Sequence, residues 1–243
     1  MPFLRAALLG LLLLVPALAQ DKAIELFHKM QRALGGADKI ASVRDYEQLV
    51  TATAWRPNGE LMGEVHKRVR WVKPNFLRLD QVGRGDTYVL YSDGKTGWEI
   101  LPDGHEAALS GGELEFAKDY LEGFQLNVWL ADRMPGYTIT SPAPNVVQIA
   151  TKKDANDTTL DPKTWLPIKE SGVSLDDPDH PVSRETQFRE WTAVGGVKFP
   201  SRVWVLHEGR KLADIATVEI KLNRGLDPHK LAMKPADSKP EIP

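Results

Sequence analysis

The histidines, which could bind a metal ion, are scattered through this sequence and form no group. Six histidines are spread along the chain, at His28, His66, His105, His180, His207 and His229. None of them forms an H-x-H or H-E-x-x-H pattern, and the chain has no cysteine. Because a zinc site needs such ligands at short, fixed spacings, we predict no dedicated metal or thiolate centre.

The common nucleotide-binding and hydrolase motifs are missing as well. Gly83-Arg84-Gly85 lacks the third glycine and the following helix of a dinucleotide-binding fingerprint, and we interpret it as a turn. No G-x-S-x-G elbow is present, which removes the simplest sign of a serine hydrolase. We therefore predict no cofactor and no enzymatic activity, and keep a hydrolase with a dispersed active site as an alternative.

Two acidic stretches offer oxygen ligands for a hard cation, Asp154–Asp161 and Asp176–His180. Neither contains the glycine and distal glutamate of an EF-hand loop. Solvated loops are the better interpretation of both.

What the chain does hold in quantity is large apolar side chains on elements expected to face inward. A curved sheet has one face that must be covered, so inward residues form either packed core or the lining of a ligand cavity. The candidates for a cavity lining are Trp71, Leu77, Leu79, Tyr91, Trp98, Phe116, Tyr120, Leu121, Phe124, Val128 and Trp129.

Apolar residues at helical spacing predict a first helix over Asp21–Leu34, ended by Gly35-Gly36, and a short helical turn over Ala37–Val43. A third helical segment is expected over Ser110–Arg133, where Ser110 and Glu113 have the spacing of a capping box. Gly123 weakens the middle of this segment, so we expect it to bend or split there and to act as a movable cover.

The rest of the chain alternates apolar and polar residues between turn signals such as Pro57-Asn58-Gly59 and Asp93-Gly94. These turns predict hairpins, and hence an antiparallel meander in sequence order. The expected strands are Tyr46–Trp55, Glu60–Val72, Phe76–Val82, Thr87–Tyr91, Thr96–Leu101, Tyr137–Thr140, Val146–Thr151, a short Thr158–Leu160, Leu166–Val173, Arg184–Trp191, Val197–Leu206 and Lys211–Leu222.

The N-terminus has the pattern of an export signal. Arg5 precedes an apolar run, Ala6–Val15, and Ala17-Leu18-Ala19 matches a signal-peptidase site. We predict a signal peptide over residues 1–19, cleavage after Ala19, and a periplasmic protein. Since there is no cysteine, we predict no lipid anchor. The net charge of −2, with mixed signs, does not favour nucleic acid as a partner.

Several local phrases resemble those of the outer-membrane lipoprotein carrier (LolA-like) superfamily. They are Arg70–Arg78, Tyr91–Trp98, Leu160–Pro167, Phe188–Trp191, Gly195–Pro200 and Leu226-Asp227-Pro228. The order of elements is also similar. The resemblance implies a mainly β fold: a half-open, strongly curved antiparallel sheet, an incomplete barrel whose concave face is covered by apolar helices. We expect one such domain over residues 20–233 and a flexible tail over residues 234–243.

The resemblance also implies an apolar cavity for acyl chains, and hence a non-enzymatic carrier of lipids or lipoproteins. Its partners would be acyl chains and membrane-associated donor or acceptor proteins, and the protein would be a monomer. An envelope-stress sensor or protein-interaction module on the same fold is the first alternative. The identity of the ligand is open at this point.

Overall fold

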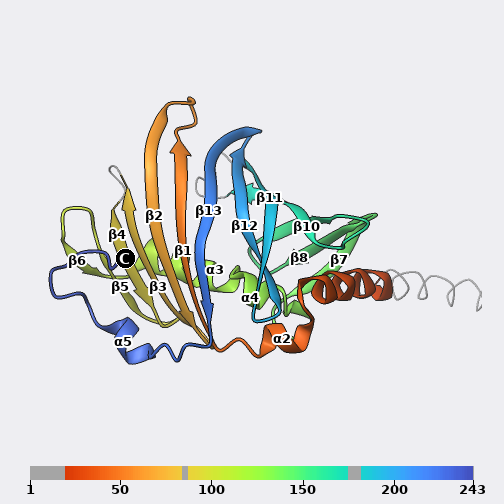
Figure 1. Cartoon of the computed structure of the whole chain (residues 1–243), viewed down its shortest axis with the longest axis horizontal. Helices are drawn as coiled ribbons and strands as arrows, with labels where there is room; N and C mark the ends of the chain where they lie inside the picture. The colour runs from red at the N-terminus through yellow and green to blue at the C-terminus, as the bar shows by residue number, and fades with distance from the viewer. Residues whose placement is uncertain (1–19, 84–86, 175–181, 243) are drawn as a thin grey trace, which may run out of the picture.

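The chain folds into one antiparallel sheet that curves strongly around its helices in the computed structural model (Figure 1), which describes residues 20–83, 87–174 and 182–242. The strands are β1 (Asp45–Trp55), β2 (Leu61–Val72), β3 (Phe76–Gly83), β4 (Tyr88–Ser92), β5 (Gly97–Ile100), β6 (Glu106–Ala108), β7 (Thr138–Ala143), β8 (Val146–Ala150), β9 (Ala155–Leu160), β10 (Pro167–Ser174), β11 (Val182–Val194), β12 (Val197–His207) and β13 (Arg210–Leu222). The helices are one over residues 20–34, α2 (Ala37–Ala41), α3 (Gly111–Glu122), α4 (Gln125–Val128), the 3-10 turn η1 (Ala131–Arg133) and α5 (Pro228–Ala232).

The sheet consists of two meanders joined side by side. Its strand order is β6-β5-β4-β3-β2-β1-β13-β12-β11-β10-β9-β8-β7. Within each meander, neighbours in sequence are neighbours in the sheet, as the turn signals predict. The joining pair is β1 with β13, in which Tyr46 lies opposite Leu222 and Ala52 opposite Ile215. The described sheet is not closed, because its edge strands β6 and β7 do not pair. This confirms the predicted fold class.

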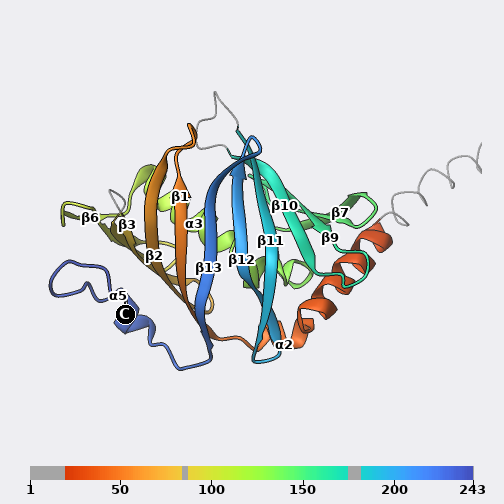
Figure 2. The same cartoon turned by 45° about the horizontal axis from the view of Figure 1, so that its top comes forward.

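The helical segment between β6 and β7 connects the two open edges, so it must cross the concave side of the sheet (Figures 1 and 2). It splits after α3, at Gly123, as predicted. The predicted capping box is not formed, because the side chain of Ser110 makes no hydrogen bond to the first turn. Gly111 has a φ of 53°, which keeps that turn out of the geometry that a capping box requires.

The first helix and α2 lie against the half of the sheet that is formed by the later strands (Figures 1 and 2). Phe27, Met30 and Leu34 are buried, and Gly35 ends the helix at a φ of 123°. A Cβ atom on Gly35 would lie 2.2 Å from the carbonyl oxygen of Gly196 in the β11–β12 turn. Glycine is therefore required here by both conformation and space.

The chain ends on the opposite side of the sheet from α3 and α4. After α5, residues 233–242 contact β2, β3 and β6 on that side of the sheet (Figure 2). Residues 234–242 of the predicted flexible tail make hydrogen bonds such as the one from the Glu241 N–H to Asp80 Oδ1 at 2.9 Å, and the flexibility of the tail stays a prediction.

Three predictions fall on parts of the chain that the structure does not describe. The signal peptide over residues 1–19, the acidic stretch Asp176–His180 and all but Gly83 of the turn Gly83-Arg84-Gly85 lie outside the described residues. Among the helices that are described, none is long and apolar enough to span a membrane.

Candidate functional site

The two faces of the sheet have different covers. We call the face that contacts α3 and α4 the inner face; Tyr46, Trp71 and Phe199 lie on it. The other face, on which α5 and residues 233–242 lie, is the outer face. Because side chains alternate along a strand, the strand register assigns the remaining residues to one face or the other.

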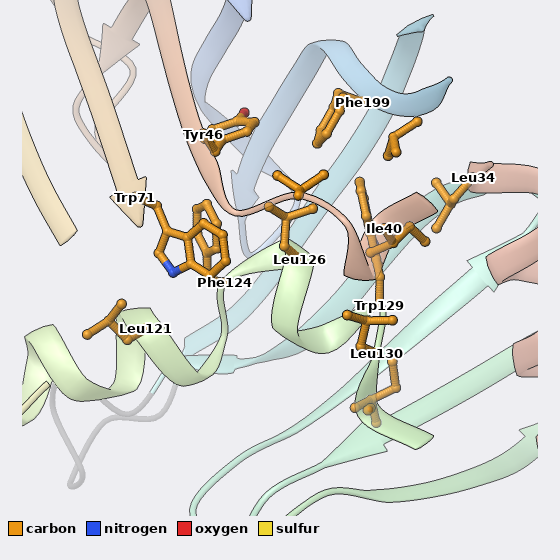
Figure 3. Packing of buried hydrophobic residues seen from close by; sticks show 14 of the residues in the cluster. Leu34, Ile40, Tyr46, Trp71, Leu121, Phe124, Leu126, Trp129, Leu130 and Phe199 are labelled. Carbon is orange, nitrogen blue, oxygen red and sulfur yellow. The ribbon is translucent and has the colours of Figure 1, made fainter. Parts of the chain in front are cut away.

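The half of the inner face beneath the helices is a packed aromatic core (Figure 3). Phe124 stacks on Trp71 with ring centroids 5.3 Å apart and meets Tyr46 edge-on at 5.6 Å. Trp129 packs on Phe199 at 5.7 Å. The Tyr46 hydroxyl is 3.2 Å from Gln125 Nε2, and burial raises the pKa of that phenol above its usual range. The helical segment is thus packed into the core in this conformation.

Nine of the eleven sequence-predicted cavity residues belong to this inner side. Six are buried in the core cluster, namely Trp71, Leu77, Leu79, Leu121, Phe124 and Trp129. Tyr120 and Val128 are partly buried against the cluster, and burial raises the pKa of Tyr120 to about 12. Phe116 is 53% exposed. That these residues contact a ligand stays a prediction.

Tyr91 and Trp98, the other two, lie on the outer face and do not join that group. Leu79 pairs with Leu90 and both belong to the inner core, so the next residue, Tyr91, must point outward. Tyr91 stacks on its cross-strand partner Trp98 at 5.8 Å, and Trp98 Nε1 donates a hydrogen bond of 2.9 Å to the Ala232 carbonyl. Their cover is α5, which the sequence did not predict as a helix.

Sequence reasoning missed a second set of apolar residues, on the inner face beyond the helices. These residues lie on the central strands and are only partly buried. We call them the inner-face patch: Val50, Ala52, Val65, Phe188, Val203, Val205 and Ile215. Alternation along each strand identifies such residues one strand at a time. The sequence does not show that β1 and β13 bring them together.

Polar and charged groups border the inner-face patch. Lys67 Nζ lies 5.6 Å from the centroid of the Tyr120 ring, and Gln48 Nε2 donates to Thr217 Oγ1 at 2.9 Å. On β10, burial raises the pKa of Glu170, an effect opposed by the nearby charge of Arg184. The patch is therefore an apolar surface with a polar margin, suited to an amphipathic molecule.

The described ranges contain no group of three or more His, Asp or Glu side chains placed to hold a metal ion. The arrangement on the inner face can bury apolar surface, which is favourable by about 25 cal/mol per Å².

Solved structures that share this fold include the following three. They are an outer membrane lipoprotein-sorting protein domain from Vibrio parahaemolyticus, a DUF1329 family protein from Desulfovibrio piger and a LolA superfamily protein from Nitrosomonas europaea. Their sequence identities to this chain are 12%, 13% and 13%, and the TM-scores are 0.57, 0.59 and 0.56. The matches cover 87%, 88% and 84% of this chain and 97% of each structure.

At these identities the likeness establishes the fold and no more. The resemblance read from the sequence is confirmed at that level: the chain has a LolA-like fold. No protein-family model and no curated protein sequence matches it.

Proposed function

We propose that this LolA-like fold serves a non-enzymatic carrier or binding protein, which holds acyl chains of lipids or lipoproteins on the inner face. The protein would act in the periplasm, after export and cleavage behind Ala19. One of the structures with the same fold is described as a lipoprotein-sorting domain, which agrees with this proposal.

The observation that carries the proposal is the inner-face patch. Its side chains, among them Val205, Ile215 and Phe188, are apolar yet retain exposed surface on the concave side of the sheet. A folded protein gains free energy when such a surface is covered, and a linear acyl chain can cover a strip that crosses several strands. The adjoining aromatic helices would flank the bound chain.

The first test is a direct search for ligand. Protein secreted with its own N-terminus and purified without detergent is extracted with organic solvent, and the extract is examined by mass spectrometry. We expect lipid or acyl-chain species in stoichiometric amount. A protein free of lipid that also fails to bind a fluorescent fatty acid would refute the proposal.

A pair of variants on one strand locates the site. Ile215→Asp places a carboxylate on the inner face, whereas Val218→Asp changes a side chain that is 64% exposed on the same strand. Because an acyl chain cannot solvate a charge, we expect Ile215→Asp to weaken fatty-acid binding by about 100-fold and Val218→Asp to leave it unchanged. Equal binding by both variants would place the ligand elsewhere.

A further inference from the structure

A group of charged side chains on the outer face of β2 and β3 has no part in the proposed function. We call Arg68, Arg70, Arg78 and Asp80 the arginine site. The side chains of Arg70, Arg78 and Asp80 are 8%, 1% and 0% exposed. The Asp80 carboxylate accepts hydrogen bonds from Arg70 Nη2 and from Arg78 Nε and Nη2. Buried charges are costly unless they are paired with opposite charges in good geometry. The pairing therefore holds these three side chains in one arrangement.

The arginine site binds every polar group of one residue of the chain's own end, Glu241. Arg70 Nη1 is 2.9 Å from one oxygen of the Glu241 carboxylate, and Arg78 Nη2 is 3.1 Å from the other. The Glu241 N–H donates to Asp80 Oδ1 at 2.9 Å, and its carbonyl accepts from Arg68 Nη1 at 3.1 Å. The site therefore recognises an acidic side chain together with its peptide group.

Apart from Glu241, few contacts hold the segment that delivers it, and one of these is the hydrogen bond of 2.9 Å from Arg78 Nη1 to the Met233 carbonyl. Residues 233–242 form no strand pairing in the described sheet. Lys234 Nζ and Ser238 Oγ both contact the Glu106 carboxylate, at 2.6 and 3.1 Å, on the exposed edge strand β6. The Glu241 side chain itself is 43% exposed. A segment with few buried contacts opens at low free-energy cost, so it resembles a tethered ligand more than a core element.

The charges of the arginine site also favour binding of another anion in place of Glu241. Arg68 pairs with Glu47 at 2.7 Å, so three guanidinium groups face the carboxylates of Glu47 and Asp80. Without Glu241 one positive charge stays unbalanced. Arg70 Nε is buried and makes no hydrogen bond in the part of the chain that the structure describes. The site thus offers net positive charge and charge-assisted donors from Arg70 and Arg78 to a carboxylate.

We propose that the arginine site binds an acidic residue of an extended peptide segment, and that an acidic segment of a partner protein displaces Glu241 from it. The contact between the Glu241 N–H and Asp80 distinguishes a peptide from inorganic phosphate or a phosphatidylglycerol headgroup, because neither of these carries an N–H donor beside its anionic group. The proposal is independent of what binds on the inner face.

The test uses the full chain and a fluorescent, N-acetylated peptide with the sequence of residues 236–243 as the probe. Glu241→Arg places a fourth positive charge beside the three arginines. Residue 241 is therefore expelled, and the arginine site is left open for the peptide. Lys239→Glu is the control, since within the described residues no hydrogen bond or ion pair joins the Lys239 side chain to the site, and its backbone N–H bonds to Asp237. Binding is measured by fluorescence anisotropy, and folding by circular dichroism.

We expect Glu241→Arg to bind the peptide at least about tenfold more tightly than the wild type or Lys239→Glu, because the tethered competitor is gone. A peptide with glutamine in place of the glutamate should not bind. The proposal is overturned if Glu241→Arg unfolds the chain, or if the folded variant binds the peptide no better than the control. Tighter binding to phosphatidylglycerol vesicles than to the peptide would overturn it as well.

Discussion

Replacing Phe124 by alanine tests whether the helical segment over the inner face belongs to the cooperative core. Phe124 lies at the break between α3 and α4, is 7% exposed, and contacts the rings of Trp71 and Tyr46. Loss of a buried phenylalanine costs about 3–5 kcal/mol. Because two favourable ring contacts are lost with it, we expect about 4 kcal/mol of lost unfolding free energy.

The assay is urea unfolding followed by tryptophan fluorescence and by circular dichroism. In thermal unfolding, the same loss of free energy would lower the Tm of a chain of this size by about 8–16 °C. Phe116→Ala is the matched control: the residue is on α3 and aromatic but 53% exposed, so its replacement should cost no more than about 0.5 kcal/mol. A cost below about 1 kcal/mol for Phe124→Ala would show that the segment is a detachable cover.

Two further predictions concern charged groups. Asp80→Ala should lower the unfolding free energy by about 3–5 kcal/mol in urea titrations, because it leaves the buried guanidinium groups of Arg70 and Arg78 without their main partner; a cost under 1 kcal/mol would contradict this. Burial and the nearby charge of Glu113 raise the pKa of Glu99 above its unfolded value of 4.5. Its contribution to stability is therefore complete below about pH 4.5 and is lost as the pH rises through the folded-state pKa. Glu99→Gln should accordingly stabilise the chain more at pH 8 than at pH 4, and an equal effect at both values would show that the carboxyl is not perturbed.

Local patterns in the sequence were sufficient to identify most of the elements. Gly35-Gly36 ends the first helix and Gly123 splits the helical segment, because each acts on the backbone within a few residues of itself. Turn residues such as Asp93-Gly94 likewise separate paired strands. Trp71, Leu77 and Leu79, which alternate with polar residues along their strands, are buried, while their role as a cavity lining stays a prediction.

The sequence did not determine which strands lie side by side and so share a face, because that depends on contacts between distant segments. The pairing of β1 with β13 joins residues such as Ala52 and Ile215, and it creates the inner-face patch. Tyr91 and Trp98 lie on the outer face because the register with β3 puts them there.

The end of the chain shows the same division between local and long-range information. Its composition of proline, lysine and small residues predicts a flexible tail, and that prediction considers only the segment itself. In the tertiary structure Glu241 lies against Asp80, 161 residues away in sequence, and completes a charged site whose other members are on β2 and β3. The sequence determined the elements through short-range backbone preferences, whereas the tertiary structure decided the two candidate binding surfaces, because each depends on side chains brought together from distant strands.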